Sequence, residues 1–313
     1  MVDEMQIRPY VAGDAEAIAD LMNTLDAKHG AEAGWTGGEL RSFFKAWLRD
    51  PETDSRLVVT PSGALAAVGI VSSPPDGGER ADMFGGVLPA YQGRGIGREL
   101  LAWQYDRVKH LHMDIAPDAA WHVETGASVG DQSAIRLFER FGFGPVRYFF
   151  EMVAPLLGSR IETALPDGLA AMPFTPELAK PLYEAHMEAF SDHWGFQRRP
   201  YEKWVISTVE SEEFRPDLTR IAFDGDEIAA YVLAYDNVEG REYIGQVGTR
   251  RPWRKRGVAS ALISASLAAA VADGKTSASL GVDADSPTGA VGVYERLGFE
   301  IKHKFVAYRR SVD

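Results

Sequence analysis

Two copies of one loop pattern constrain this chain more than any other feature of its sequence. The second copy, residues 246–259, passes from a strand end through a basic glycine turn into a helix, and reads R-x-x-G-x-A from Arg254 to Ala259. Gly257 lets the backbone approach a ligand without a Cβ in the way. We expect the amides of residues 255–259 to point outward at the helix N-terminus, where unpaired N–H groups and the helix dipole favour an anion.

The first copy, residues 87–97, has the related form Q-x-x-G-x-G. Each copy is followed about forty residues later by a second matching segment, LFERFGF at residues 137–143 and VYERLGF at residues 293–299. Two ordered motifs that each occur twice indicate an internal duplication. A chain of 313 residues is long for one domain and suits two domains of about 150 residues.

The charge distribution indicates a small polyanionic ligand. Five cations lie within residues 250–256 of a chain whose formal net charge is −12, and a local positive mouth in an acidic protein attracts an anion. A solvated basic turn is the alternative interpretation. The nucleotide patterns G-x-x-x-x-G-K-[ST] and G-x-G-x-x-G occur in neither copy. The acidic balance argues against nucleic acid as a partner.

In these paired motifs the sequence resembles the GNAT superfamily of acetyl-CoA-dependent N-acetyltransferases, arranged in tandem as in the mycothiol synthase type. The resemblance implies an α/β fold with a mixed sheet. It consists of two tandem acyl-CoA N-acyltransferase domains, each a central, mostly antiparallel, splayed sheet flanked by helices. We expect residues 1–156 to form a non-catalytic domain and residues 157–313 a catalytic one, joined by a linker at residues 154–168 that is rich in proline and glycine.

The resemblance also implies which residues bind acetyl-CoA, the cosubstrate. In the family, the pantetheine arm pairs with amides of the strand before the loop, one of which faces the thioester oxygen and stabilises its developing charge. The implied residues of the second half are Val247, Gly248, Thr249, Arg254, Lys255, Arg256, Gly257, Val258, Ala259 and Ser260, with Arg250 and Arg251 near the phosphates. Those of the first half are Val87, Gln92, Gly93, Arg94, Gly95, Ile96 and Gly97.

Tyr294, in the segment VYERLGF, is the implied general acid that protonates the departing thiolate. A phenol, whose pKa is near 10, is a suitable acid for a thiolate leaving group. The alternative interpretation is a core aromatic on a helix. The matching residue of the first half is Phe138, which has no proton to donate. We therefore expect catalysis in the second half only, with the first half structural or binding cofactor without turnover.

The general base is predicted less directly. Glu242 is the nearest candidate on the strand before the loop, although Tyr243 stands at the place where the family has its glutamate. A slip of one residue turns a side chain to the other face of a sheet, unless a bulge restores it. An exposed glutamate at a strand end is the alternative interpretation. Asp236 and Glu239 are further candidates.

Residues 190–196 are the segment that roofs the acceptor pocket in the family. Aromatic side chains with a few polar groups suit a small molecule that carries an amine. Asp192 is a candidate partner for the cation of the acceptor, His193 a second candidate base, and Trp194 a pocket wall. The alternative is that these aromatics pack a seam between the domains.

The remaining expectations concern what the chain lacks. It contains no cysteine, which excludes disulfides, thiolate metal sites and a cysteine relay. No spacing of His, Asp and Glu predicts a metal. The N-terminus has no signal-peptide pattern, and the longest run of small apolar residues is too short to span a membrane, so we expect a cytoplasmic protein. The oligomeric state is not predicted.

The favoured function is an acetyl-CoA-dependent N-acetyltransferase that acts on the primary amine of a small molecule by direct attack on the thioester. One alternative is a mycothiol synthase-type enzyme. Another is a non-catalytic, regulatory protein that binds acyl-CoA. Tyr294 favours an enzyme, and amine-dependent release of thiol from acetyl-CoA would separate these classes.

Overall fold

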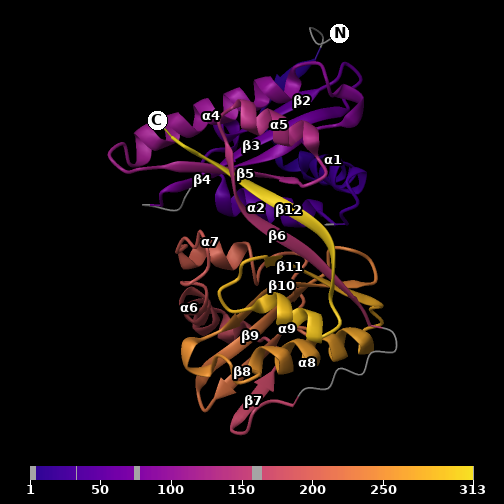
Figure 1. The fold of residues 1–313 in the computed structure, drawn as a ribbon, viewed down its shortest axis with the longest axis vertical. Coiled ribbons are helices and arrows are strands. Elements are labelled where there is room, and N and C mark those ends of the chain that lie inside the picture. Colours follow the sequence, from indigo (N-terminus) through magenta and orange to yellow (C-terminus); the bar gives the residue numbers. More distant parts are fainter. Residues whose placement is uncertain (1–4, 33, 74–77, 157–163, 313) are drawn as a thin grey trace. The chain divides into compact units, whose positions relative to one another are not determined.

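A computed structural model describes residues 5–32, 34–73, 78–156 and 164–312. The chain divides into two compact units (Figure 1), residues 1–148 with 304–313 and residues 149–303. This division differs from the expected boundary at residue 156. Of the expected linker at residues 154–168, residues 157–163 lie outside the described part of the chain, and residues 154 and 155 belong to a strand.

The first unit is a sheet with helices on both faces. Its strands, in their order across the sheet, are β1 (Gln6–Arg8), β2 (Ser55–Val59), β3 (Leu65–Ser72), β4 (Arg80–Val87), β5 (His122–Ser128) and the end of β12 (Glu300–Ser311). Its helices are α1 (Ala15–Lys28), α2 (Gly37–Trp47), α3 (Pro51–Asp54), α4 (Ile96–Ile115) and α5 (Gln132–Arg140), with short 3-10 turns η1 (Ala12–Asp14) and η2 (Pro89–Tyr91).

The second unit repeats this plan. Its strands, again in order across the sheet, are the end of β6 (Gly144–Pro155), β11 (Ser277–Asp283), β10 (Arg241–Thr249), β9 (Glu227–Tyr235), β8 (Arg220–Asp224) and β7 (Leu169–Met172). Its helices are α6 (Ala179–Ala189), α7 (Tyr201–Ile206), α8 (Val258–Ala272) and α9 (Ala290–Arg296), with η3 (Pro176–Leu178) and η4 (Arg251–Trp253).

Each unit is completed by a strand from the other half of the sequence. Residues 149–155 of β6 pair antiparallel with β11 in the second unit. Residues 305–311 of β12 pair antiparallel with β5 in the first unit. Consecutive elements are usually neighbours, but here each of these strands pairs within the unit that is formed chiefly by the other half of the sequence. The exchange brings residues of the first half into the second unit.

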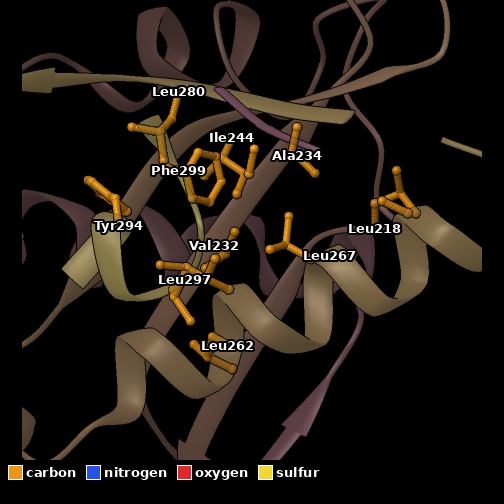
Figure 2. Close-up of a cluster of buried hydrophobic side chains, with 14 of the residues drawn as sticks. Leu218, Val232, Ala234, Ile244, Leu262, Leu267, Leu280, Tyr294, Leu297 and Phe299 are labelled. Atoms are coloured by element: carbon orange, nitrogen blue, oxygen red, sulfur yellow. The ribbon is translucent and has the colours of Figure 1, made fainter. Parts of the chain in front are cut away.

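The core of the second unit lies on both faces of its sheet. On one face, α8 and α9 cover a cluster in which Leu262, Leu267 and Leu297 meet Val232 and Ile244 of the strands, as Figure 2 shows. On the other face, α6 and α7 pack on a second cluster that includes Leu182, Trp204, Tyr231 and Leu233. The cluster that a residue of β10 contacts therefore shows to which face of the sheet its side chain points.

Candidate active site

The second glycine loop has the backbone of an anion site. Strand β10 ends at Thr249, the turn η4 follows, and α8 begins at Val258. Gly257 adopts φ +82° at the start of the helix, and no side chain caps its first amides. Lys255 has φ +60°, the one non-glycine residue with positive φ in the described chain. This conformation costs a non-glycine residue roughly 1–2 kcal/mol, and such strain tends to persist at functional sites.

The first loop has the same construction. Gly93 (φ +76°) and Gly95 (φ +88°) stand where the second loop has Lys255 and Gly257, and α4 begins at the next residue. Gln92 Nε2 donates to the carbonyl oxygen of Val87 at 3.0 Å. Arg254 Nε donates to the carbonyl oxygen of Thr249, also at 3.0 Å. The first side chain of each motif thus ties its turn to the last residue of the preceding strand.

The structure places the implied cofactor residues along one continuous path in each half. Val247, Gly248 and Thr249 are the last residues of β10, residues 254–257 form the turn, and Val258, Ala259 and Ser260 begin α8. In the first half, Val87 ends β4, residues 92–95 form the turn, and Ile96 and Gly97 begin α4. Their contact with acetyl-CoA stays a prediction.

Both sheets open directly before these loops. Residues 241–244 of β10 pair in parallel with residues 277–280 of β11, and the pairing ends there although both strands continue. Strands β4 and β5 likewise pair only over residues 80–82 and 122–124. The unpaired edge of β10 beyond Ile244 leaves backbone N–H and C=O groups for a pantetheine arm, as the resemblance implied.

The five cations of the second loop have two different roles. Lys255 and Arg256 are exposed and stand beside the amides of the turn. Arg250 Nε donates to Glu188 Oε2 at 2.6 Å. Arg251 and Arg254 both bind Asp192, at 2.6 and 2.7 Å. Phosphate binding is therefore expected chiefly of Lys255 and Arg256.

Asp192 is thus already paired with this loop, and its expected role as a partner for the cation of the acceptor stays a prediction. The guanidinium groups of Arg251 and Arg254 hold the pKa of Asp192 below its usual range. Arg254 also donates from Nη2 to the carbonyl oxygen of Ala189 at 3.0 Å. These contacts link the C-terminal end of α6 to the second glycine loop.

Glu242 faces away from the expected acceptor side. It is completely buried and pairs in register with Ala278, which belongs to the cluster under α8 and α9. The pairing of β10 with β9 shifts register between Ile244 and Gln246, and this bulge lies after Glu242. The bulge therefore puts Tyr243 on the same face as Gln246 and Gly248, and leaves Glu242 on the other. Glu242 is not placed to act as the base.

The contacts of Glu242 indicate that it is protonated. Ser266 Oγ lies 2.5 Å from Glu242 Oε1 and 2.8 Å from the carbonyl oxygen of Leu218. A hydroxyl has one proton, so Ser266 cannot donate to both oxygens. Both contacts are satisfied when Ser266 donates to Leu218 and a protonated Glu242 donates to Ser266. Burial raises the pKa of Glu242 to about 7, against smaller opposing effects of Ser266 and Arg220.

Glu242→Gln should flatten the pH dependence of stability. Because the pKa of Glu242 is raised from 4.5 to about 7 on folding, the wild-type protein should lose about 3 kcal/mol of stability between pH 4.5 and pH 7 from this group. Glutamine keeps a donor for Ser266 and does not titrate. Urea unfolding at pH 5 and pH 8 should show this loss as the difference between the wild type and the variant, because the other titrating groups are common to both proteins. An equal loss in both proteins would refute the assignment of a protonated Glu242. Because Glu242 is not placed to act as the base, the pH–rate profile of the variant should match that of the wild type.

The other two candidate bases on this part of the chain differ in exposure. Asp236 is bound by Arg215 at 2.6 Å and by Lys275 at 2.7 Å. Glu239 is exposed in the turn before β10. Neither residue is brought to the opening of the sheet.

Tyr294 lies in α9 among the apolar residues of the second unit, beside Phe299 with 6.0 Å between ring centroids (Figure 2). It is 8% exposed, and burial raises its pKa to about 12. Phe138 has the matching place in the first unit, 6.2 Å from Phe143 and likewise 8% exposed. The two matching residues thus differ by a hydroxyl, which stays protonated across the neutral range in Tyr294.

The loop after α6 lies on the face of the sheet opposite to Tyr294's cluster. His193 stacks on Phe190 with 4.3 Å between ring centroids, and Trp194 lies 6.1 Å from Phe149 of β6. Burial lowers the pKa of His193, while the carboxylate of Asp283 acts in the opposite direction. His193 is therefore neutral at pH 7 and able to accept a proton. Its role as a base stays a prediction, as does that of Trp194 as a pocket wall.

Sequence reasoning missed Gln246, which lies on the same face. Its Oε1 atom is buried and accepts no hydrogen bond from the described residues. A buried acceptor of this kind is usually satisfied. Only the bulge puts Gln246 on this face, and no sequence motif predicted the bulge.

Among the described residues, no group of His, Asp and Glu could hold a metal ion. None of the described helices combines the length and the apolar character that a membrane span requires.

Comparison with known proteins supports the reading of both halves. Residues 179–299 match the model of the acetyltransferase (GNAT) family, and residues 54–145 match that of an acetyltransferase (GNAT) domain. A mycothiol acetyltransferase of Streptomyces avermitilis is 30% identical over 231 residues, which cover 71% of this chain and 69% of the relative. The chain belongs to the GNAT family of acetyltransferases. Its two GNAT domains confirm the expected fold class and tandem arrangement.

Two further GNAT relatives match over nearly the whole chain. A mycothiol acetyltransferase of Clavibacter michiganensis subsp. michiganensis is 29% identical over 315 residues, covering 97% of this chain and 98% of the relative. The crystal structure of a GCN5-related N-acetyltransferase from Sphaerobacter thermophilus superposes with a TM-score of 0.78 at 29% identity, covering 99% of this chain and 96% of that one. The protein is thus an acetyl-CoA-dependent N-acetyltransferase, as expected.

Proposed function

We propose that the second unit transfers the acetyl group of acetyl-CoA to the primary amine of a small molecule by direct attack. The turn at residues 254–257 and the start of α8 bind the diphosphate. The last amides of β10 orient the thioester, and Tyr294 protonates the sulfur that leaves. The observation that carries this proposal is the hydroxyl of Tyr294, buried in the second unit where the first has Phe138.

The first unit is proposed not to catalyse transfer. Its face over β4 is filled by apolar side chains, since Phe84 lies 5.4 Å from Trp35 and 6.2 Å from Phe43. An acceptor on that face would have to displace these side chains, and Phe138 would give it no proton.

The proposal is tested by following thiol release from acetyl-CoA with a panel of primary amines. Amine-dependent release with acetylated product supports an enzyme. Coenzyme A binding without release for any amine would favour the non-catalytic alternative. A mycothiol-type acceptor is the second candidate, because relatives of this chain are named mycothiol acetyltransferases. The panel should therefore include the desacetyl form of mycothiol.

Lys255→Asn should weaken the binding of acetyl-CoA without slowing the chemistry. Asparagine tolerates positive φ better than most residues, so the substitution removes the charge and keeps the turn. We expect KM for acetyl-CoA to rise about 3- to 10-fold, which corresponds to about 1 kcal/mol, with kcat unchanged. The difference should shrink at 1 M salt, where charges are screened. An unchanged KM at low salt would remove Lys255 from the phosphate site.

A further inference from the structure

Strand β6 carries a carboxylate of the first half of the sequence into the second unit. Glu151 pairs in register with Gly281 of β11. Its neighbours in the strand, Met152 and Phe150, pack on the cluster under α8 and α9. Because side chains alternate along a strand, Glu151 projects from the opposite face, the one covered by α6 and α7.

Gly281, the residue that pairs with Glu151, lies where the sheet opens between β10 and β11. Pairing between β10 and β11 ends at Leu280, so Gly281 is the first residue of β11 beyond it. Gly281 has no side chain to fill this face, and a Cβ built there would lie 4.0 Å from Tyr243 Oη. Glu151 and Tyr243 therefore lie on the two strands that flank β11 at Gly281, with both side chains on this face of the sheet. Gln246, with its buried and unsatisfied Oε1, lies on the same face of β10.

The first unit provides a built-in comparison. Gly126 is the fifth residue of β5, as Gly281 is of β11, and it is likewise exposed. The residue that pairs with Gly126 is Ala307 of β12. The unit with Phe138 therefore has alanine where the unit with Tyr294 has glutamate. The carboxylate and the phenol occur in the same unit, although they come from different halves of the sequence.

The geometry points to Glu151 as the carboxylate that binds the ammonium group of the acceptor and takes its proton, an inference that rests on the proposed function. It supplies the base that Glu242, on the wrong face, cannot supply. The acceptor class is a primary alkylamine that arrives protonated, with Tyr243 Oη and Gln246 Oε1 as further hydrogen-bond partners.

The proton balance of the reaction is as follows. The ammonium nitrogen gives one proton to Glu151, which passes it to solvent. The neutral nitrogen then forms a bond to the carbonyl carbon as the carbon–sulfur bond breaks, and Tyr294 gives its proton to the sulfur. The nitrogen loses a second proton, through Glu151, and this proton restores Tyr294. The products are the amide, coenzyme A as a thiol, and one proton in solvent.

The test compares Glu151→Gln with the wild type on two nucleophiles. Hydroxylamine is largely neutral at pH 7 and needs little help from a base, whereas an alkylamine such as glycinamide or desacetyl-mycothiol is largely protonated. We expect Glu151→Gln to lower alkylamine-dependent kcat/KM by about 10²-fold or more and hydroxylamine-dependent release by less than about 3-fold. Glu151→Asp should recover part of the alkylamine rate. Glu300→Gln, which removes an exposed carboxylate that pairs with Lys302, is the matched control.

Every other outcome would refute either the inference on Glu151 or the proposed function. Unchanged alkylamine rates in Glu151→Gln would overturn the inference. An equal loss with both nucleophiles, while coenzyme A still binds and the melting temperature is kept, would also overturn it, because a base is then not what was removed. If Glu151→Gln does not fold, the same comparison is made with Glu151→Asp, whose equal loss on both nucleophiles has the same meaning. Failure of the wild type to release thiol with any nucleophile would instead refute the proposed function.

Discussion

Replacing Tyr294 by phenylalanine should lower kcat by about 10²-fold or more while leaving KM for acetyl-CoA nearly unchanged. The substitution removes only the hydroxyl from a buried ring, so the packing of α9 is kept. Without that proton the thiolate must leave unprotonated or wait for water. The measurement is steady-state thiol release with an acceptor from the amine panel, together with the melting temperature of the variant.

Tyr308→Phe is the matched control for this prediction. Tyr308 is also buried, but it packs beside Phe138 in the first unit, so its hydroxyl should not affect turnover. Because burial raises the pKa of Tyr294 to about 12, its deprotonation should produce no fall in kcat below about pH 11. Unchanged turnover in Tyr294→Phe would remove this residue from the mechanism.

Gly248→Ala should both destabilise the protein and impair catalysis. A Cβ at this position would lie 2.3 Å from Cζ of Tyr231, whose side chain is completely buried. The Tyr231 hydroxyl is also hydrogen-bonded to His186 Nδ1 at 2.7 Å, so the ring cannot readily turn aside. Overpacking of this kind costs typically 1–3 kcal/mol. The bulged end of β10 should shift, and with it the amides proposed to orient the thioester.

We therefore expect Gly248→Ala to lower kcat/KM for acetyl-CoA by at least about 10-fold, since small misplacements of orienting groups are costly. Urea unfolding and steady-state kinetics measure the two effects. Gly144→Ala is the control, because a Cβ there meets no atom within 4 Å and its φ is not positive. Wild-type stability and kinetics in Gly248→Ala would show that this part of β10 does not depend on Tyr231.

Tyr231→Leu combined with Gly248→Ala separates crowding from other causes. A smaller side chain at residue 231 should relieve the contact and recover part of the kcat/KM that Gly248→Ala alone loses. Contacting residues are expected to be non-additive in this way. Simple addition of the two losses would mean that the effect of Gly248→Ala does not pass through Tyr231.

Local features of this protein could be predicted from its sequence. The loops at residues 92–97 and 254–259 begin α4 and α8 as expected, because glycine at a positive φ and the apolar spacing that follows are encoded in neighbouring residues. The difference between Phe138 and Tyr294 was likewise visible, since the two lie in matching segments. The family and its donor follow from these motifs.

Features that depend on distant residues were decided by the tertiary structure. Whether β6 and β12 close their own halves depends on which sheet edge each strand reaches, and no local pattern determines that. The exchange places Glu151 in the second unit. One extra residue in β10 turns Glu242 under α8 and Tyr243 toward the open face. The pairing of Asp192 with Arg251 and Arg254 could not be predicted, because these partners are far from it in sequence. A sequence determines local backbone preferences directly, whereas the face and the partner of a side chain are set only when strands are paired.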